Sequence, residues 1–268
     1  MTMLESKFLS YNPYEFLVPE TFRMMWANEA ARLELEPKIT QLSREFQSAE
    51  LSSVIDKRRN ACIQVVPLGY LKMGSEYMNF LHTLKVAVID YVKMQDVYSN
   101  ASERPVTFSE AGARILISND GSDDLGYPKC CQQFFKYYWE ELGHRDTIPF
   151  QLHFEKEITN YYPCCNILLK GLGIRAVPHL PCSMRCEATN QFAFKFGTYL
   201  SRESHQFLNE MLTLPMKYSS YHGYAEVQTE YFKLMFNSLP LGSKYECNIQ
   251  PIKLFQVVPY APEGTSIQ

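Results

Sequence analysis

The stretch "HLPCSMRCEATNQF", residues 179–192, places a Cys-x-x-x-Cys pair directly after a proline and ahead of an apolar run with helical spacing. Proline is favoured at the first position of a helix, so the pattern predicts a helix that begins near Pro181. Cys182 and Cys186 then lie on one helix face, where both sulfurs can reach the same point. Such a pair suits a metal site, a redox site or two cysteines in a core.

Two further segments repeat this layout of a proline, cysteines and an apolar run. They are "GYPKCCQQFFKYYWEEL", residues 126–142, and "YYPCCNILLKGL", residues 161–172. The start of a helix has unpaired N–H groups and a partial positive charge, which favour the thiolate form of cysteine. Because the thiolate is the form that binds metals, three such helix starts that meet at one point predict a sulfur-rich metal centre.

The candidate metal ligands are the six cysteines of these segments: Cys130, Cys131, Cys164, Cys165, Cys182 and Cys186. Adjacent residues of a helix point about 100° apart, so each Cys-Cys doublet is expected to supply one sulfur. The apolar stripes of their helices contain Cys131 and Cys165, which slightly favours the other member of each doublet as the ligand. A buried centre lies on the apolar side too, so all six stay candidates.

The expected cofactor is an iron-sulfur cluster, with zinc as the alternative, because both can be held by four thiolates. Structural zinc sites usually contain Cys-x-x-Cys knuckles, and the sequence has none. We therefore expect an iron-sulfur enzyme, an oxidoreductase or lyase that acts on a small organic substrate. A separate protein could donate electrons to its cluster. The rivals are a non-enzymatic binding or scaffold protein with a structural zinc, a metal-free thiol enzyme, and cysteines that only fill a core.

Four polar residues near the cysteines are candidates for catalysis. His179 lies three residues before Cys182, where its ring could face the centre as a ligand or a proton donor. In the segment "GHRD", His144 and Asp146 could form a proton-transfer pair. Arg185 could bind a substrate carboxylate or offset thiolate charge. Loop positions on the surface explain the same residues without any chemistry.

The combination of "GYPKCC" and, further along, "HLPCSMRC" resembles the pattern of a poorly characterised prokaryotic family of unknown function. The resemblance covers only the central part of the chain and does not include the doublet at 164–165. It implies a microbial origin and adds weight to five residues: Cys130, Cys131, His179, Cys182 and Cys186. It implies no reaction.

Charge and hydropathy exclude several classes of partner. The formal net charge is -3 and the isoelectric point is near 6.1, and the one compact basic run, residues 57–59, is too short to follow a phosphate backbone. Nucleic acid is therefore not expected as a partner. No apolar run approaches the roughly 18 residues that a membrane span requires, and no export signal is present. We expect a cytoplasmic protein whose thiols stay reduced.

The pattern along the chain predicts an α+β fold. Helical spacing predicts a mainly helical N-terminal half, with helices over 19–36, 38–59, 75–98 and 109–118, the first of them ended by Pro37, and a short β-prone run over 62–68. Segments 216–237 and 247–260 are rich in Tyr, Val, Phe and Ile with turn residues between them, which predicts a small antiparallel sheet. The best division lies at the loop 119–126, which gives a helical region 1–120 and a cysteine-rich region 121–268 within one compact domain.

Overall fold

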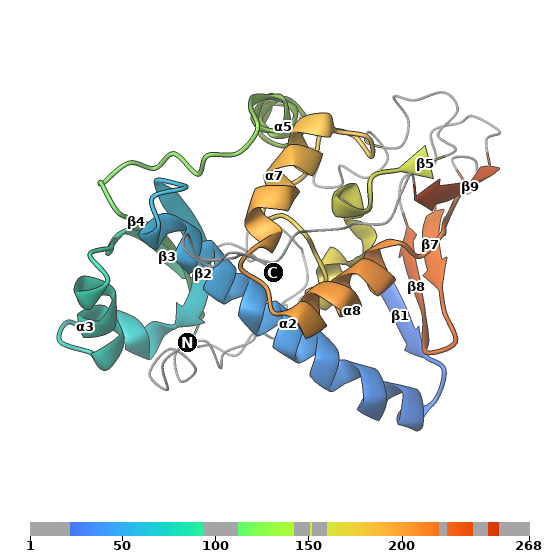
Figure 1. The fold of residues 1–268 in the computed structure, drawn as a ribbon, viewed down its shortest axis with the longest axis horizontal. Coiled ribbons are helices and arrows are strands. Elements are labelled where there is room, and N and C mark those ends of the chain that lie inside the picture. Colours follow the sequence, from blue (N-terminus) through green and yellow to red (C-terminus); the bar gives the residue numbers. More distant parts are fainter. Residues whose placement is uncertain are drawn as a thin grey trace, which may run out of the picture. The chain divides into compact units, whose positions relative to one another are not determined.

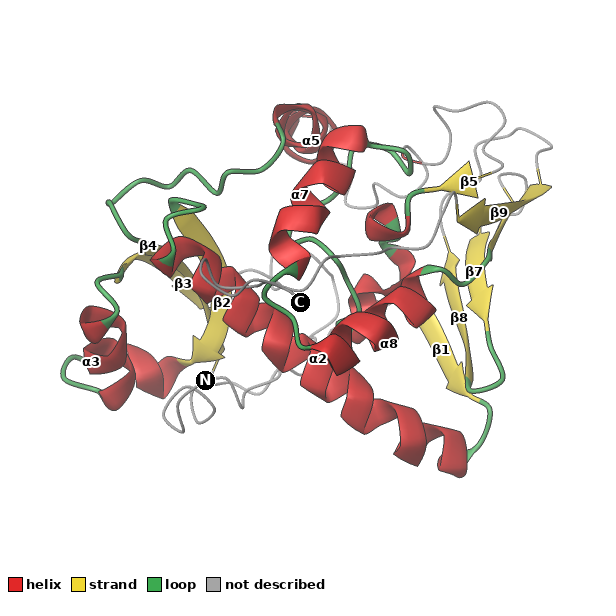
Figure 2. Ribbon diagram, viewed as in Figure 1, coloured by secondary structure: helices red, strands yellow, loops and turns green. Residues whose placement is uncertain are grey.

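The computed structural model describes residues 22–93, 112–141, 151, 160–219, 224–237 and 246–251. It contains helices and mainly antiparallel sheets, so the predicted α+β class is confirmed (Figures 1 and 2). The described residues form two compact units. The first unit comprises Arg44–Gly126, and the second comprises the residues up to Ser43 and those from Tyr127 onward. The division expected at residue 120 stays a prediction.

The first unit is built on a three-stranded antiparallel sheet with the order β2-β4-β3. Its elements are β2 (Ala61–Pro67), η1 (Leu68–Leu71), α3 (Glu76–Thr83), β3 (Ala87–Lys93), β4 (Gly112–Ser118) and the later part of α2 (Glu29–Ile55). The core lies between the sheet and these helices, where Val54, Leu81 and Ile117 are buried. The β-prone run at 62–68 therefore forms a strand, as predicted.

Two segments of this unit form strands although their patterns predict helices. In the segment 75–98, Ser75 does cap a helix, but α3 ends at Thr83 and β3 follows. In the segment 109–118, residues from Gly112 onward form β4. Valine and isoleucine are stiff at χ1 and pack well on a pleated surface, so they favour strands here over a continued helix.

The second unit contains a six-stranded sheet with the order β1-β8-β7-β6-β9-β5, antiparallel except for the β9–β5 pair. Its strands are β1 (Phe22–Trp26), β5 (Asn160–Tyr161), β6 (Met216–Ser219), β7 (Tyr224–Gln228), β8 (Phe232–Asn237) and β9 (Glu246–Pro251). The small sheet predicted near the C-terminus is thus confirmed. The predicted helix 19–36 is wrong at its start, because β1 pairs with β8 from Phe22 to Trp26.

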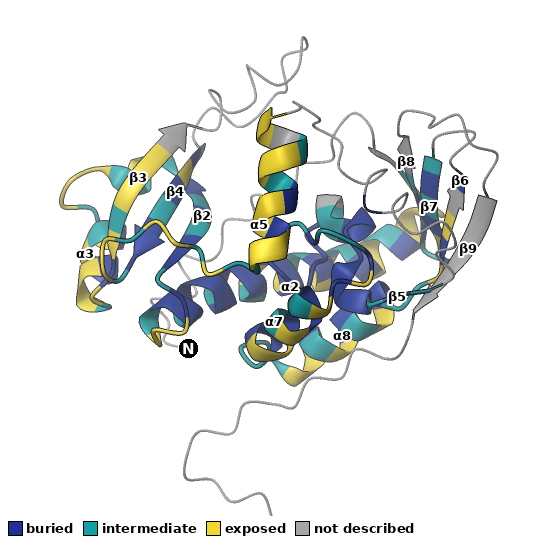
Figure 3. Cartoon of the chain, turned by 90° about the horizontal axis from the view of Figure 1, so that it is seen from above, coloured by how far each residue is buried: buried dark blue, intermediate teal, exposed yellow. Residues whose placement is uncertain are grey.

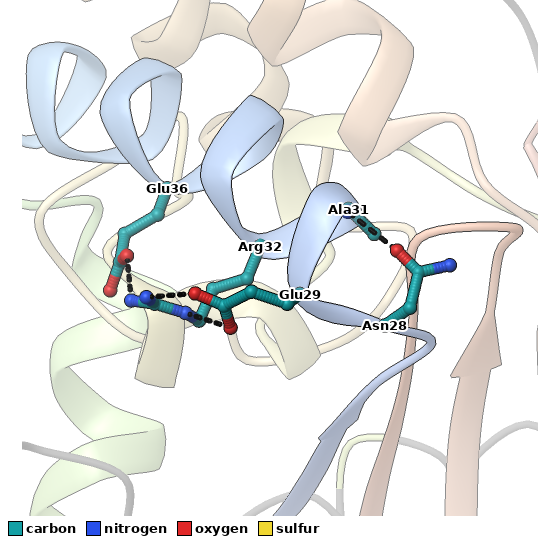
Figure 4. Close-up of polar contacts among 5 residues, drawn as sticks. All are labelled: Asn28, Glu29, Ala31, Arg32 and Glu36. Atoms are coloured by element: carbon teal, nitrogen blue, oxygen red, sulfur yellow. Dashed lines mark hydrogen bonds and ion pairs between the residues drawn. The ribbon is translucent and has the colours of Figure 1, made fainter.

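Helix α2 begins at Glu29 instead, and local contacts explain why (Figure 4). The Asn28 side chain accepts a hydrogen bond from the backbone N–H of Ala31 at 2.8 Å, which caps the first turn. Arg32 then donates to Glu29 at 2.6 Å and to Glu36 at 2.7 Å, at the spacings that join neighbouring turns. These pairs are exposed to solvent, so they help to set the start of the helix but contribute little to its stability.

Pro37 does not end the first helix, because α2 runs through it to Ile55. Proline inside a helix costs about 3 kcal/mol. The flanking residues Leu35, Ile39 and Leu42 are buried in the core of the second unit, and each fully buried aliphatic side chain contributes roughly 1.5–3 kcal/mol. The buried stripe therefore outweighs the proline, whose ring lies on the exposed side.

The remaining helices of the second unit surround the cysteine-rich segments. They are α5 (Lys129–Phe135), continued by a π-helical turn η2 (Lys136–Glu141), the 3₁₀ turns η3 (Pro163–Cys165) and η4 (Leu168–Leu172), α7 (Glu187–Gly197) and α8 (Arg202–Leu212). Both α7 and α8 have buried and exposed residues on different sides (Figure 3). Ala193 of α7 and the buried apolar residues of α8 join one hydrophobic cluster that also contains four of the cysteines: Cys131, Cys164, Cys165 and Cys186.

Pro37→Ala should raise the free energy of unfolding by about 1–2 kcal/mol, because alanine restores the missing N–H and removes the ring from the turn before it. Thermal or denaturant unfolding measures the change. The matched control is Lys38→Ala, which removes only an exposed ion pair with Glu34 and should change stability by less than about 1 kcal/mol. A Pro37→Ala chain that is less stable than its parent would show that α2 needs the proline.

Candidate metal centre

Four cysteines from distant parts of the chain meet in the second unit: Cys130, Cys131, Cys182 and Cys186. Their sulfur atoms all lie within 4.8 Å of one another. Cys186 Sγ is 3.7 Å from the sulfurs of both Cys130 and Cys131, and those two are 3.9 Å apart. Four sulfurs at this spacing can serve as the ligands of a metal ion.

The first two sulfurs come from the first turn of α5, which begins after Pro128. The fixed φ of proline favours the turn that follows it, and the N–H of Cys131 bonds the carbonyl of Pro128 at 2.9 Å. Both neighbours contribute a sulfur to the group, which differs from the expected one sulfur per doublet. Side chains of a helix lean toward its N-terminus, so two sulfurs in the first turn can meet ahead of the helix despite their angular separation.

The other two sulfurs come from the segment before α7, and the predicted helical pair is wrong in its geometry. Helix α7 begins at Glu187, so Cys182 lies in the turns before it and only Cys186 belongs to the helix end. Cys186 is the N-cap residue, and its Sγ accepts a hydrogen bond from the N–H of Thr189 at 3.4 Å. The sulfur thus takes the place that a serine or aspartate oxygen usually occupies.

The doublet of Cys164 and Cys165 lies outside this group of four. It sits in a 3₁₀ turn, where both residues are almost fully buried. Cys164 donates to Asn190 Oδ1 at 3.6 Å, and Cys165 donates to the carbonyl oxygen of Cys186 at 3.8 Å. Burial raises the pKa of the Cys165 thiol, which keeps it neutral. In the structure these two thiols therefore lie in the core next to the group of four, where Cys164 bonds the Asn190 side chain and Cys165 bonds the backbone of Cys186.

Three of the four cysteines, Cys131, Cys182 and Cys186, shift one another's pKa values. Hydrogen bonds from Cys131 and Cys182 lower the pKa of Cys186 well below its usual range. Hydrogen bonds with Cys131 and Cys186, together with burial, raise the pKa of Cys182. A bound metal ion would allow all four thiols to ionise, because its positive charge offsets the repulsion between thiolates.

A buried hydrogen-bond chain connects the centre to His179. Thr189 Oγ1 lies 3.3 Å from Cys131 Sγ and 2.9 Å from His179 Nε2. If Cys131 binds a metal ion as a thiolate, it can only accept hydrogen bonds. The single hydroxyl proton of Thr189 would then go to Cys131, and the hydroxyl oxygen would accept from His179 Nε2–H. This chain assigns the proton to Nε2 of the histidine. The ring is held between Tyr127 and Phe192, with centroids at 5.2 and 5.0 Å.

The structure does not bring the other residues predicted for catalysis, as far as it describes them, into this hydrogen-bond chain. Arg185 is exposed, between the two sulfur-bearing positions of its segment. His144 and Asp146 lie outside the described residues. Sequence reasoning missed Thr189 and Asn190, although Thr189 is three residues after Cys186, the position whose N–H bonds an N-cap side chain. The catalytic roles expected for His179, Arg185 and the His144–Asp146 pair stay predictions.

Thr189→Val should lower the free energy of unfolding of the metal-loaded chain by about 1–3 kcal/mol, because the buried His179 Nε2–H and Cys131 sulfur both lose their bond to the hydroxyl. Denaturant unfolding measures the loss. Thr189→Ser keeps the hydroxyl and is the matched control, with a smaller effect expected from the missing methyl group. Equal stability of the Val variant and the parent would contradict the hydrogen-bond chain.

Comparison with known proteins adds no relative to this picture. None of the protein-family models, curated proteins or solved structures compared with the chain matches it. The resemblance to a prokaryotic family therefore stays an expectation. Within the described part of the chain, no helix combines the length and the apolar character that crossing a membrane requires. The conclusion at this stage is a protein with four cysteines so placed that they can bind a metal ion.

Proposed function

We propose that the chain is a zinc-binding protein in which Cys130, Cys131, Cys182 and Cys186 hold one ion in a tetrahedral site. The observation that carries this proposal is the spacing of the sulfurs. A zinc ion about 2.3 Å from each of four sulfurs makes the edges of the sulfur tetrahedron about 3.8 Å long. The Sγ–Sγ distances among Cys130, Cys131 and Cys186 are 3.7, 3.7 and 3.9 Å.

The same spacing bears on the iron-sulfur cluster expected from the sequence. In a four-iron cluster each cysteine binds a different iron, so the thiolates lie further apart than thiolates that share one ion. Four sulfurs within 4.8 Å of one another favour a single ion. An iron-sulfur enzyme acting on a small organic substrate is therefore the second candidate, and it requires the four cysteines to move apart.

Four protein ligands favour a structural role for the ion. A catalytic zinc keeps one coordination position open for water or substrate, whereas a tetrahedral site with four cysteines is closed. The ion would join the start of α5 to the start of α7, two helix ends that are distant in sequence. This geometry supports the binding or scaffold class of protein, with the metal holding the core of the second unit in one arrangement.

Metal analysis of the purified chain tests the proposal directly. We expect a colourless protein with about one zinc ion per chain, measured by elemental mass spectrometry after anaerobic purification. A brown protein that contains several irons and acid-labile sulfide would contradict the single-ion site and support the iron-sulfur candidate.

Alanine variants identify the ligands. Replacing Cys182 or Cys186 should reduce the zinc content from about one ion per chain to a small fraction, and so should replacing Cys130 or Cys131. Cys164→Ala and Cys165→Ala are the matched controls, because these buried thiols bond to oxygen and should leave the zinc in place. Loss of metal from the two control variants, with retention in Cys130→Ala or Cys131→Ala, would contradict this ligand set.

Removal of the ion should destabilise the second unit. Structural zinc contributes several kcal/mol to folding, so a chelator is expected to lower the unfolding temperature by about 10 °C or more. Circular dichroism during heating measures the shift, and added zinc should reverse it. An unfolding temperature that does not respond to the chelator would contradict a structural role.

A further inference from the structure

The four sulfurs of the proposed zinc site differ in their access to solvent. Cys130 is exposed, and Cys182 is half-buried against the core. Cys131 and Cys186 have exposed fractions of only 2% and 6%. Cys130 is therefore the residue of the four that is most open to a small reagent from solvent.

The sulfurs also differ in their hydrogen bonds. Thr189 donates its N–H to Cys186 and, by the proton assignment above, its hydroxyl to Cys131. A hydrogen bond to a thiolate withdraws electron density and makes the sulfur a weaker nucleophile. Among the residues that the structure describes, the polar contacts of Cys130 Sγ are with the sulfurs of Cys131 and Cys186. Cys130 is thus the thiolate that is both accessible and not weakened by an N–H or O–H donor.

We propose that Cys130 is the residue at which hydrogen peroxide oxidises this centre, and that Cys186 then forms a disulfide with it and the metal is released. Cysteines that sense oxidants are accessible thiolates beside a second cysteine that resolves the first product. Both conditions hold here, since the sulfurs of Cys130 and Cys186 are 3.7 Å apart. The inference rests on the proposed zinc site, because the bound ion keeps Cys130 in the thiolate form.

The reaction balances with the peroxide as the only oxidant. The Cys130 thiolate attacks one peroxide oxygen, so an S–O bond forms, the O–O bond breaks, and the departing hydroxide takes a proton from solvent to become water. Cys130 is now a sulfenic acid, oxidised by two electrons. The Cys186 thiolate attacks its sulfur, an S–S bond forms, the S–O bond breaks, and the departing hydroxide takes a proton from solvent and leaves as a second water. The ion has lost two of its four ligands and dissociates.

Cys186 is a better partner for this disulfide than the adjacent Cys131. A bond between neighbouring residues closes a small ring that forces their peptide away from its planar trans form, and both residues belong to the first turn of α5. Cys186 precedes α7 and has an extended backbone with φ -65° and ψ 106°, so its side chain can turn without breaking a helical turn. The product then links α5 to the start of α7.

The test uses the full chain loaded with zinc, whose metal content is measured before the oxidant is added. One equivalent of hydrogen peroxide is added with a chromogenic zinc chelator and, in a parallel sample, with dimedone to trap sulfenic acid. The remaining thiols are alkylated after denaturation, and peptides are mapped by mass spectrometry. We expect a Cys130–Cys186 disulfide, one zinc released per disulfide, and dimedone on Cys130. Cys62 should remain a thiol, because burial raises its pKa and excludes the reagent.

Cys165→Ala is the matched control, because it removes a thiol outside the group of four that contacts Cys186 and leaves the four sulfurs in place. It should give the same disulfide and the same loss of zinc. A disulfide that excludes Cys130, dimedone on another cysteine, or zinc that stays bound while Cys130 is oxidised would each overturn the inference and leave the zinc site intact. A chain that takes up no zinc would contradict the proposed function, and the inference with it.

Discussion

Mutual repulsion of the four sulfur atoms is the constraint on which the rest of this unit depends. Thiolates within 4.8 Å of one another cannot all ionise in a partly buried site without a cation, and neutral thiols alone gain little from being gathered there. Hydrogen bonds among Cys131, Cys182 and Cys186 lower the pKa of Cys186 and raise the pKa of Cys182. A positive ion resolves the conflict, because it changes the repulsion into four metal–sulfur bonds.

The surrounding structure holds the sulfurs in place by ordinary means. Proline starts α5, and the sulfur of Cys186 caps α7, where it accepts the N–H of Thr189. Thr189 supports two of the sulfurs and is itself held by His179. Behind them, Cys165 bonds the carbonyl of Cys186 in the dry core. These outer contacts orient the ligands, as the partners of metal ligands do in known metal sites.

A closed metal site with one accessible sulfur can serve structure and chemistry together. Binding of an ion to the folded form alone stabilises that form, so any reaction that removes a ligand also weakens the fold. In this chain the accessible sulfur belongs to Cys130, whereas Cys131 and Cys186 lie in the hydrophobic cluster of the second unit. Loss of the ion would therefore act on the core and on the ends of α5 and α7.

Local signals in the sequence determined a good part of this protein. Proline next to cysteine marked the starts of α5 and of the turn at Pro163, the Tyr- and Val-rich stretch 216–237 indicated the strands β6 to β8, and the clustering of cysteines indicated a metal site.

Only the tertiary structure decided which sulfurs meet. In α5 the side chains lean toward the start of the helix, which brings the sulfurs of Cys130 and Cys131 to one point. The 3₁₀ turn instead directs the thiols of Cys164 and Cys165 toward oxygen atoms. The tertiary structure also decided where burial overrides the local pattern. The buried stripe of α2 keeps this helix continuous at Pro37, and pairing with β8 stabilises residues 22–26 as a strand. Such contacts join residues far apart in the chain, and no short window of sequence contains them.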